Sequence, residues 1–280
     1  MTRAAAFFDL DKTVIAKSST LAFGRPFFHG GLINRRAVLK AAYAQFVFSL
    51  AGADAQQMER LRQQITAMCT GWDAAAVHEI VRETLHEIVA PLIYAEAADL
   101  IEEHRAAGRE IVIVSSSGAE VVQPIGVMLG ADRVVATQMV IAEGRYTGEI
   151  EFYAYGENKA AAVREVAAAG GYDLADCYAY SDSVTDLPLL DAVGHPTAVN
   201  PDRGLRKAAA ERGWPVLEFS RPVSLHSRLQ MPSGPVVTGA AVGVGAAVVG
   251  LAWYARHRAA RAAGLDAPGT PSGRRWRRGA

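Results

Sequence analysis

The spacing of hydrophobic positions changes twice along the chain. Residues 4–10 form an apolar run that ends in acidic side chains, as in a buried strand of a parallel sheet. From residue 18 to residue 90, apolar side chains recur every three or four positions, as on the inward faces of a small helical bundle. Beyond Pro91, helical and strand-like patterns alternate. This alternation predicts an α/β fold with a doubly wound parallel sheet.

The alternating region divides into short segments. Helices are predicted over residues 95–107, from 119 to about 129, over 157–169 and over 202–212. Strands are predicted over residues 110–114, 177–180, 196–199 and 215–219, with a hairpin over 134–141 and 146–150. Ligands of such a sheet bind at the carboxyl ends of its strands.

Polar side chains gather where the predicted strands end. They are Asp9, Asp11 and Thr13 after the first strand, the serines 115–117 after the second, Lys159 near a helix start, and Asp182 and Asp186 after a later strand. Because the carboxyl ends of parallel strands meet at one edge, we expect these groups to converge in a single crevice.

The pair Asp9 and Asp11 carries the first chemical signal. In a strand, side chains two residues apart lie on the same face. Two carboxylates that close repel each other, and each makes the other harder to ionise. The pair therefore indicates a bound cation, a shared proton, or a reaction that needs one acid and one base.

Composition narrows the function classes. The chain has 280 residues, a formal net charge of +0 and 21% charged residues, so overall charge favours no polyanionic partner and nucleic-acid binding is not indicated. The two cysteines, Cys69 and Cys177, are too few for a disulfide framework and suit a reducing compartment.

The C-terminal region predicts a membrane anchor. Residues 235–254 are free of charge and have about the length of one membrane-spanning helix. Gly239 and Gly243 would let a second copy approach, giving a homodimer. Residues 221–234 read as a linker and 255–280 as a basic, disordered tail. A buried core helix is the alternative for 235–254. The N-terminal stretch lacks the apolar region of a signal peptide, so we expect a single-pass membrane protein with a cytoplasmic catalytic body.

Four stretches, taken together and in this order, resemble one enzyme family. They are D-L-D-K-T at 9–13, I-V-I-V before Ser115, G-E-N-K ending at Lys159, and S-D-S-V-T-D-L-P at 181–188. This set resembles the phosphatase branch of the haloacid dehalogenase superfamily, and within it the phosphoserine-phosphatase-like group of subfamily IB. The resemblance implies a catalytic core over residues 1–17 and 91–220 with an inserted helical cap over 18–90.

The resemblance also implies roles for the polar groups. Asp9 would be the nucleophile that forms an aspartyl-phosphate, and Asp11 the general acid and base. Ser115, Ser116 and the N–H groups that follow Ser115 would hold the phosphoryl oxygens. Lys159 would neutralise charge on the phosphate and on Asp9.

The family resemblance also implies a magnesium site. Asp9, Asp182 and the backbone carbonyl of Asp11 would hold Mg²⁺, which prefers carboxylate and carbonyl oxygens. Asp186 would orient a metal-bound water or Lys159, and Thr13 would support the site from behind.

The sequence departs from the family pattern at two points. Ser181 replaces the usual glycine before the metal-binding aspartate, a small change that we expect to be tolerated. Ser18 stands where phosphoserine phosphatases carry a glutamate that reads the substrate's amino group, and the neighbouring Lys17 would repel an ammonium. Both residues argue against phosphoserine as the natural substrate.

Several functions stay open at this point. The leading interpretation is a Mg²⁺-dependent hydrolase of a small phosphomonoester such as phosphoserine. The membrane span and the aromatic residues Phe23, Phe27 and Phe28 favour a lipid-linked phosphate, of the lysophosphatidate or phosphatidylglycerophosphate type. A catalytically silent membrane scaffold is a third reading. A phosphotransferase or phosphonatase on the same fold is a fourth, for which only Lys40 lies well inside the cap.

Overall fold

The computed structural model describes residues 3–33, 63 and 66–221. In chain order the described elements are β1 (Ala5–Asp9), α1 (Ser19–Ala22), α2 (Gly24–His29), α5 (Ala74–Val89), η1 (Ala90–Leu92), α6 (Ala95–Ala106), β2 (Glu110–Gly118), α7 (Ala119–Met128), β3 (Arg133–Ala142), β4 (Arg145–Phe152), α8 (Glu157–Gly170), η2 (Leu174–Asp176), β5 (Tyr178–Ser181), η3 (Val184–Asp186), α9 (Leu187–Leu190), β6 (His195–Val199), α10 (Arg203–Arg212) and β7 (Val216–Leu217).

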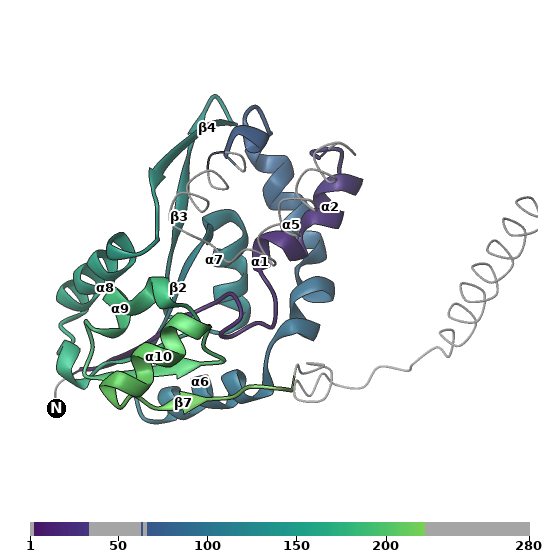
Figure 1. Ribbon diagram of the computed structural model, residues 1–280. Coiled ribbons are helices and arrows are strands. Elements are labelled where there is room, and N and C mark those ends of the chain that lie inside the picture. Colours follow the sequence, from purple (N-terminus) through teal and green to yellow (C-terminus); the bar gives the residue numbers. More distant parts are fainter. Residues whose placement is uncertain (1–2, 34–62, 64–65, 222–280) are drawn as a thin grey trace, which may run out of the picture. The chain divides into compact units, whose positions relative to one another are not determined.

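The strands form one sheet in the order β4-β3-β2-β1-β5-β6-β7 (Figure 1). Pairing is parallel from β3 across to β7, and only the β3–β4 hairpin is antiparallel. The chain begins at the central strand β1, builds outward on one side through β2 and then on the other through β5. The predicted doubly wound α/β sheet is therefore confirmed, with its switch point beside β1.

Helices cover both faces of the sheet. Successive side chains of β1 point to opposite faces, so the strand contributes to a core on each side. Phe8 joins a core with the apolar faces of α5, α6 and α7, and Phe7 joins a second core with α8, α9 and α10. Figure 1 shows α8, α9 and α10 together on the second face. All five β1 residues are buried, which explains why the strand reads as one continuous apolar run.

The described part of the segment between β1 and β2 is helical, as its apolar spacing predicts. Helix α5 begins at an N-cap, where the Asp73 carboxylate accepts a hydrogen bond from the Ala76 N–H (3.1 Å), and its stripe of valine and leucine packs inward. Phe23 and Phe27 are buried in the core with α5, and Phe28 packs against it. Phe23 and Phe28 are therefore packing residues, whereas Phe27 also lines a cavity described below. The predicted apolar positions from 39 to 50, and Lys40, lie outside the described residues.

Several predicted boundaries shift for local reasons. Strand β2 continues four residues past the predicted end, because Ser115 and Gly118 pair with Ala136 and Thr137 of β3 on either side of a register shift. Strand β7 is shorter than the predicted 215–219. Helix α10 begins at Arg203, and Asp202 is its N-cap.

The expected membrane location needs correction. None of the helices within residues 3–33, 63 and 66–221 combines the length and hydrophobicity that a bilayer crossing requires. The segment 235–254, on which that expectation rested, lies outside the described residues, as do the predicted linker and tail from residue 222 onward. The described residues therefore give no support to a membrane anchor.

Candidate active site

The crevice forms where β1, β2 and β5 end and α8 begins. Asp9 is the last residue of β1, and the chain then turns sharply, with Lys12 in the left-handed region at φ 65°. The N–H groups of Val14 and Ile15 both donate to the Leu10 carbonyl (3.0 Å each), which closes the turn. The assumption that Asp11 continues the strand is therefore wrong. Asp11 lies in the turn, and its side chain takes partners different from those of Asp9.

Lys159 lies between two aspartates at the base of the crevice. Its Nζ contacts Asp9 Oδ1 at 2.6 Å and Asp186 Oδ2 at 2.7 Å, and the side chain is 2% exposed. It projects from the first turn of α8, which follows Gly156 at φ 56°. Burial alone would lower the pKa of Lys159, but the charges of Asp186 and Asp9 outweigh it and raise that pKa. The lysine therefore stays charged and binds both carboxylates.

The surroundings of the Asp9 carboxyl shift its pKa strongly. Burial raises its pKa well above the ordinary value, Lys159 opposes that shift, and the charges of Asp186 and Asp182 add to it. More negative charge is thus buried here than one lysine balances.

The loop after β5 places two more aspartates. Ser181 Oγ donates to Asp186 Oδ2 (2.6 Å) and accepts from the Ser183 N–H (3.2 Å). The residue that replaces the family's usual glycine is therefore a hydrogen-bonding part of the site. The Asp182 carbonyl accepts from the Asp202 N–H (2.7 Å), which ties this loop to the start of α10. Burial raises the pKa of Asp182 to about 7.

Asp11 faces the end of β2. Its Oδ2 accepts from Ser117 Oγ and its Oδ1 from the Ser19 N–H, each at 2.7 Å. Thr20 Oγ1 donates in turn to Ser117 Oγ (3.1 Å). Ser117 is a site residue that the sequence argument did not single out, although it shares the serine triplet and lies two positions after Ser115.

The other predicted residues take different positions. Ser115 is buried, and its Oγ accepts from the Ser117 N–H (3.1 Å). Ser116 is exposed, and its carbonyl accepts from Thr137 Oγ1 (2.7 Å). Thr13 is fully buried, and its hydroxyl has no hydrogen-bond partner among the described residues.

The donor set suits a hard divalent cation. Within the described ranges, no three histidine, cysteine, aspartate or glutamate side chains form a ready-made metal cluster. The predicted set needs only two side chains, Asp9 and Asp182, because its third ligand is a backbone carbonyl and Mg²⁺ keeps several waters. Both carboxyls are buried, and burial raises the pKa of each. A cation would offset this excess of negative charge, so the residues fit the metal.

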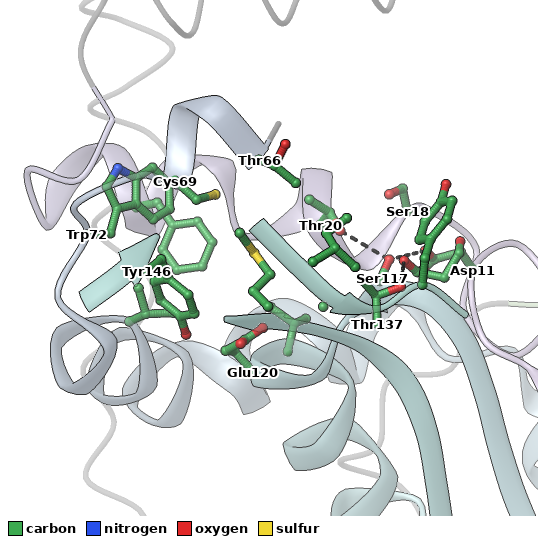
Figure 2. Close-up of a pocket in the computed structure, with 18 residues that line it drawn as sticks. Asp11, Ser18, Thr20, Thr66, Cys69, Trp72, Ser117, Glu120, Thr137 and Tyr146 are labelled. Atoms are coloured by element: carbon green, nitrogen blue, oxygen red, sulfur yellow. Dashed lines mark hydrogen bonds between the residues drawn. The ribbon is translucent and has the colours of Figure 1, made fainter. Parts of the chain in front are cut away.

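A cavity of about 260 Å³ opens beside Asp11 (Figure 2). It lies between the helices that follow β1 and the β2–β4 part of the sheet. Its lining residues are Asp11, Ser18, Thr20, Phe27, Thr66, Cys69, Trp72, Val77, Ser116, Ser117, Gly118, Glu120, Val121, Thr137, Met139, Tyr146, Ile150 and Tyr153. Asp11 and Ser117 stand at one side in Figure 2, and Trp72, Cys69 and Tyr146 at the other. The cavity can therefore take a leaving group whose phosphate lies near Asp11.

A central-strand aspartate beside a buried lysine and two further aspartates, at the switch point of a doubly wound sheet, is an arrangement that suits phosphoryl transfer. The chain belongs to the haloacid dehalogenase-like hydrolase family, whose sequence model matches residues 6–191. This confirms the family that the four motifs indicate.

Named relatives agree with this assignment. A Streptomyces azureus protein named for inhibition of morphological differentiation is 62% identical over 266 residues, covering 93% of this chain and 96% of the relative. A probable phosphatase of Mycobacterium tuberculosis is 62% identical over 254 residues, covering 90% and 88%. A phosphoserine phosphatase of the same organism is 34% identical over 260 residues, covering 92% and 82%.

A solved structure shows the same fold. The crystal structure of a Bordetella pertussis protein of unknown function superposes with a TM-score of 0.68 at 30% identity, covering 78% of this chain and 99% of that one. The family and its named phosphatases confirm the predicted enzyme class, a phosphoric monoester hydrolase.

Proposed function

We propose that the protein hydrolyses a small phosphomonoester with Mg²⁺, through an aspartyl-phosphate on Asp9. The observation that carries the proposal is the buried contact of Lys159 with Asp9 and Asp186, next to an Asp11 held at the cavity. Lys159 binds Oδ1 of Asp9, which leaves Oδ2 to attack phosphorus. The site thus presents an oriented nucleophile whose charge is balanced from one side.

The first half-reaction uses the two aspartates in different protonation states. Asp9 Oδ2 bonds to phosphorus while the bond from phosphorus to the ester oxygen breaks, and Asp11 gives its proton to the departing alkoxide. Ser117 and the Ser19 N–H keep the Asp11 carboxyl at the cavity wall, where the leaving group lies. In the second half-reaction Asp11 takes a proton from water, the water attacks phosphorus, and phosphate leaves Asp9.

The remaining residues stabilise charge. Lys159 and the N–H groups after Ser115 would bind phosphoryl oxygens, which is the main requirement of phosphoryl transfer. When bound by Asp9, Asp182 and the Asp11 carbonyl, Mg²⁺ would add positive charge next to the phosphate. Ser181 holds Asp186, and Asp186 holds Lys159, so the lysine is positioned through two hydrogen bonds.

Two substrate classes were open, a small phosphomonoester and a lipid-linked phosphate. The relatives named as phosphatases favour a phosphomonoester. The lipid-linked alternative rested on a membrane span, which the described residues do not support, and on three phenylalanines that pack in or against the core, of which Phe27 also lines the cavity. We therefore propose a small phosphomonoester and leave the lipid alternative aside.

The test is an assay of the full chain on p-nitrophenyl phosphate and on phosphoserine, with Mg²⁺ and with EDTA. We expect turnover that EDTA abolishes and that Mg²⁺ restores. Asp9→Asn should lower kcat by at least about 10³-fold, because the nucleophile is lost. Asp191→Asn, an exposed aspartate paired with Arg212 at 3.3 Å, is the matched control and should keep full activity. Turnover that survives Asp9→Asn, or that ignores EDTA, contradicts the mechanism. No turnover would favour a catalytically silent protein.

A further inference from the structure

The cavity has a polar end that the proposed chemistry does not use. Glu120 lies in the first turn of α7 and Tyr146 lies on β4, and both side chains line the cavity. Figure 2 shows them on the side away from Asp11 and Ser117. Neither residue belongs to the four motifs, so their presence in one cavity needs its own explanation.

Gly118 makes room for the Glu120 carboxylate. A Cβ at position 118 would lie 2.7 Å from Glu120 Oε2, closer than a real Cβ contact. With glycine at this position, the carboxylate folds back over the end of β2 and stays in the cavity. Glycine at the junction of β2 and α7 therefore leaves room for the acid in this position.

The Tyr146 hydroxyl is buried next to the Glu120 carboxylate. The side chain is 3% exposed, and its oxygen makes no hydrogen bond of normal geometry with any described residue. Burial, and after it the charge of Glu120 and an interaction of the hydroxyl with that carboxylate, raise the pKa of Tyr146, so the hydroxyl stays neutral. A neutral hydroxyl can donate to a carboxylate, so Tyr146 is placed to orient Glu120 at the cavity.

The charged side chains that the described residues contribute to the cavity have one sign. Among the eighteen described residues that line it, Asp11 and Glu120 are the only ones with a charged side chain, and both are acids. Lys17, whose charge seemed to oppose an ammonium, is exposed and does not line the cavity. Asp11 and Glu120 would repel an anionic leaving group, whereas a cation would pair with Glu120.

The rest of the wall is mostly apolar. Phe27, Trp72, Met139 and Ile150 contribute aromatic and aliphatic surface. Such walls bind apolar bodies, and the few polar groups orient the ligand. A first-turn acid on a helix also gains from the helix dipole.

We propose that Glu120 and Tyr146 select phosphomonoesters whose alcohol carries a protonated nitrogen on an apolar body and has no carboxylate. The inference rests on the proposed function, because it places the phosphate at Asp9 and the alcohol in the cavity. The protonated nitrogen donates to Glu120, and the Tyr146 hydroxyl beside that carboxylate orients it. Phosphoserine, which carries a carboxylate beside its ammonium, fits this cavity poorly.

The test compares two matched esters on the full chain with Mg²⁺. One is the phosphate ester of phenylalaninol, which has an ammonium and an aromatic ring, and the other is 3-phenylpropyl phosphate, which lacks the nitrogen. We expect wild-type kcat/KM to favour the amine by about 10- to 100-fold, as for a charge-assisted hydrogen bond. Glu120→Gln should bring the ratio of the two kcat/KM values close to one. Tyr146→Phe should reduce the ratio several-fold.

Glu149→Gln is the matched control. Glu149 precedes Ile150 on β4 but is exposed and does not line the cavity, so the same chemical change there should leave the ratio at its wild-type value. Turnover of 3-phenylpropyl phosphate by Glu120→Gln shows that this variant is folded. A ratio near one in the wild type, or an unchanged ratio in Glu120→Gln, overturns the proposal.

A binding measurement separates this inference from the proposed function. Calorimetry with Asp9→Asn measures binding of both esters without turnover, and the double variant Asp9→Asn/Glu120→Gln measures what Glu120 contributes. A preference for the amine that needs Glu120 supports the inference even where no hydrolysis is found. Equal binding of the two esters overturns it even in an active enzyme.

Discussion

At the scale of single residues, Lys159 determines the charge balance of the site. Its ammonium binds Asp9 and Asp186 in a setting from which water is almost entirely excluded. Removing one partner of a buried ionic group is far more harmful than losing a surface pair, because the other charges stay buried without compensation.

Lys159→Met should therefore weaken both folding and activity. We expect the free energy of unfolding in EDTA to fall by about 3 kcal/mol and kcat to fall at least about 100-fold. Urea denaturation and the p-nitrophenyl phosphate assay measure the two effects. Lys207→Met is the control, because Lys207 is exposed and pairs with Glu211 on the surface at 3.7 Å. It should cost less than about 0.5 kcal/mol. Equal losses in both variants would mean that Lys159 holds no uncompensated charge.

A second buried residue makes folding depend on pH. His104 on α6 is buried, and its ring nitrogens lie 2.8 Å from the Tyr180 hydroxyl and 3.3 Å from Arg109 Nη1. Burial, and then the charge of Arg109, lower the pKa of His104 from 6.5 to about 4. In the unfolded chain His104 takes up a proton near pH 6.5, whereas in the folded protein it does so only near pH 4.

Stability should thus fall as pH drops from about 6.5 to about 4, where the unfolded state binds more protons. The His104 share of this loss should approach about 3 kcal/mol, at 1.36 kcal/mol per pKa unit. Urea denaturation at pH 7, 6 and 5 should show a steeper loss for the wild type than for His104→Gln. His86→Gln, an exposed histidine of α5, should follow the wild type. Parallel curves for the wild type and His104→Gln would refute this assignment.

At the scale of elements, the junction of β5, η3 and α10 positions Asp182. Asp202 Oδ1 accepts from the Leu205 N–H (2.7 Å) as the N-cap of α10, and its Oδ2 accepts from the Val184 N–H (3.0 Å). Its own N–H donates to the Asp182 carbonyl (2.7 Å). One aspartate thus joins a helix start to the loop that carries a proposed metal ligand.

Asp202→Ala should reduce stability and also impair metal use. Loss of the N-cap should cost about 1 kcal/mol, and the freed loop should raise the Mg²⁺ concentration for half-maximal activity several-fold. Asp202→Asn keeps a side-chain acceptor for the N-cap and should lie closer to the wild type.

Asp73→Ala is the matched control for this prediction. It removes the N-cap of α5, which is not part of the crevice. Asp73→Ala should lower the free energy of unfolding by about as much as Asp202→Ala does, and it should leave the Mg²⁺ dependence of activity unchanged. The same Mg²⁺ shift in both variants would show a general loss of stability rather than an effect on the loop.

At the scale of the whole molecule, metal binding should be coupled to folding. A cation that binds only the native state at 100 times its Kd adds about 2.7 kcal/mol to the free energy of unfolding. For a chain of this size we expect Mg²⁺ to raise Tm by about 5–10 °C and EDTA to reverse the rise. Asp182→Asn should abolish most of the shift. Thermal unfolding with and without Mg²⁺ measures it, and an equal rise in Asp182→Asn would exclude Asp182 as a ligand.

The fold class and most of the crevice could be predicted from the sequence because they depend on local patterns. The buried run of β1, the alternation after Pro91 and the acids at strand ends are all legible in a few consecutive residues. Parallel strands place their carboxyl ends on one edge, so Asp9, Lys159 and Asp186 could be expected together without any coordinates. Local sequence patterns, together with the common edge of parallel strands, were enough to predict the fold class and this group of residues.

Tertiary structure alone decided which neighbours the remaining side chains meet. The turn at Lys12 takes Asp11 out of the strand, and the irregular end of β2 brings Ser117 to it while Ser116 faces solvent. The approach of Glu120 and Tyr146 joins two elements whose sequences give no sign of each other. Alternation and spacing describe one element at a time. A bulge, a left-handed turn or a helix packing on a distant strand resets which face a residue occupies.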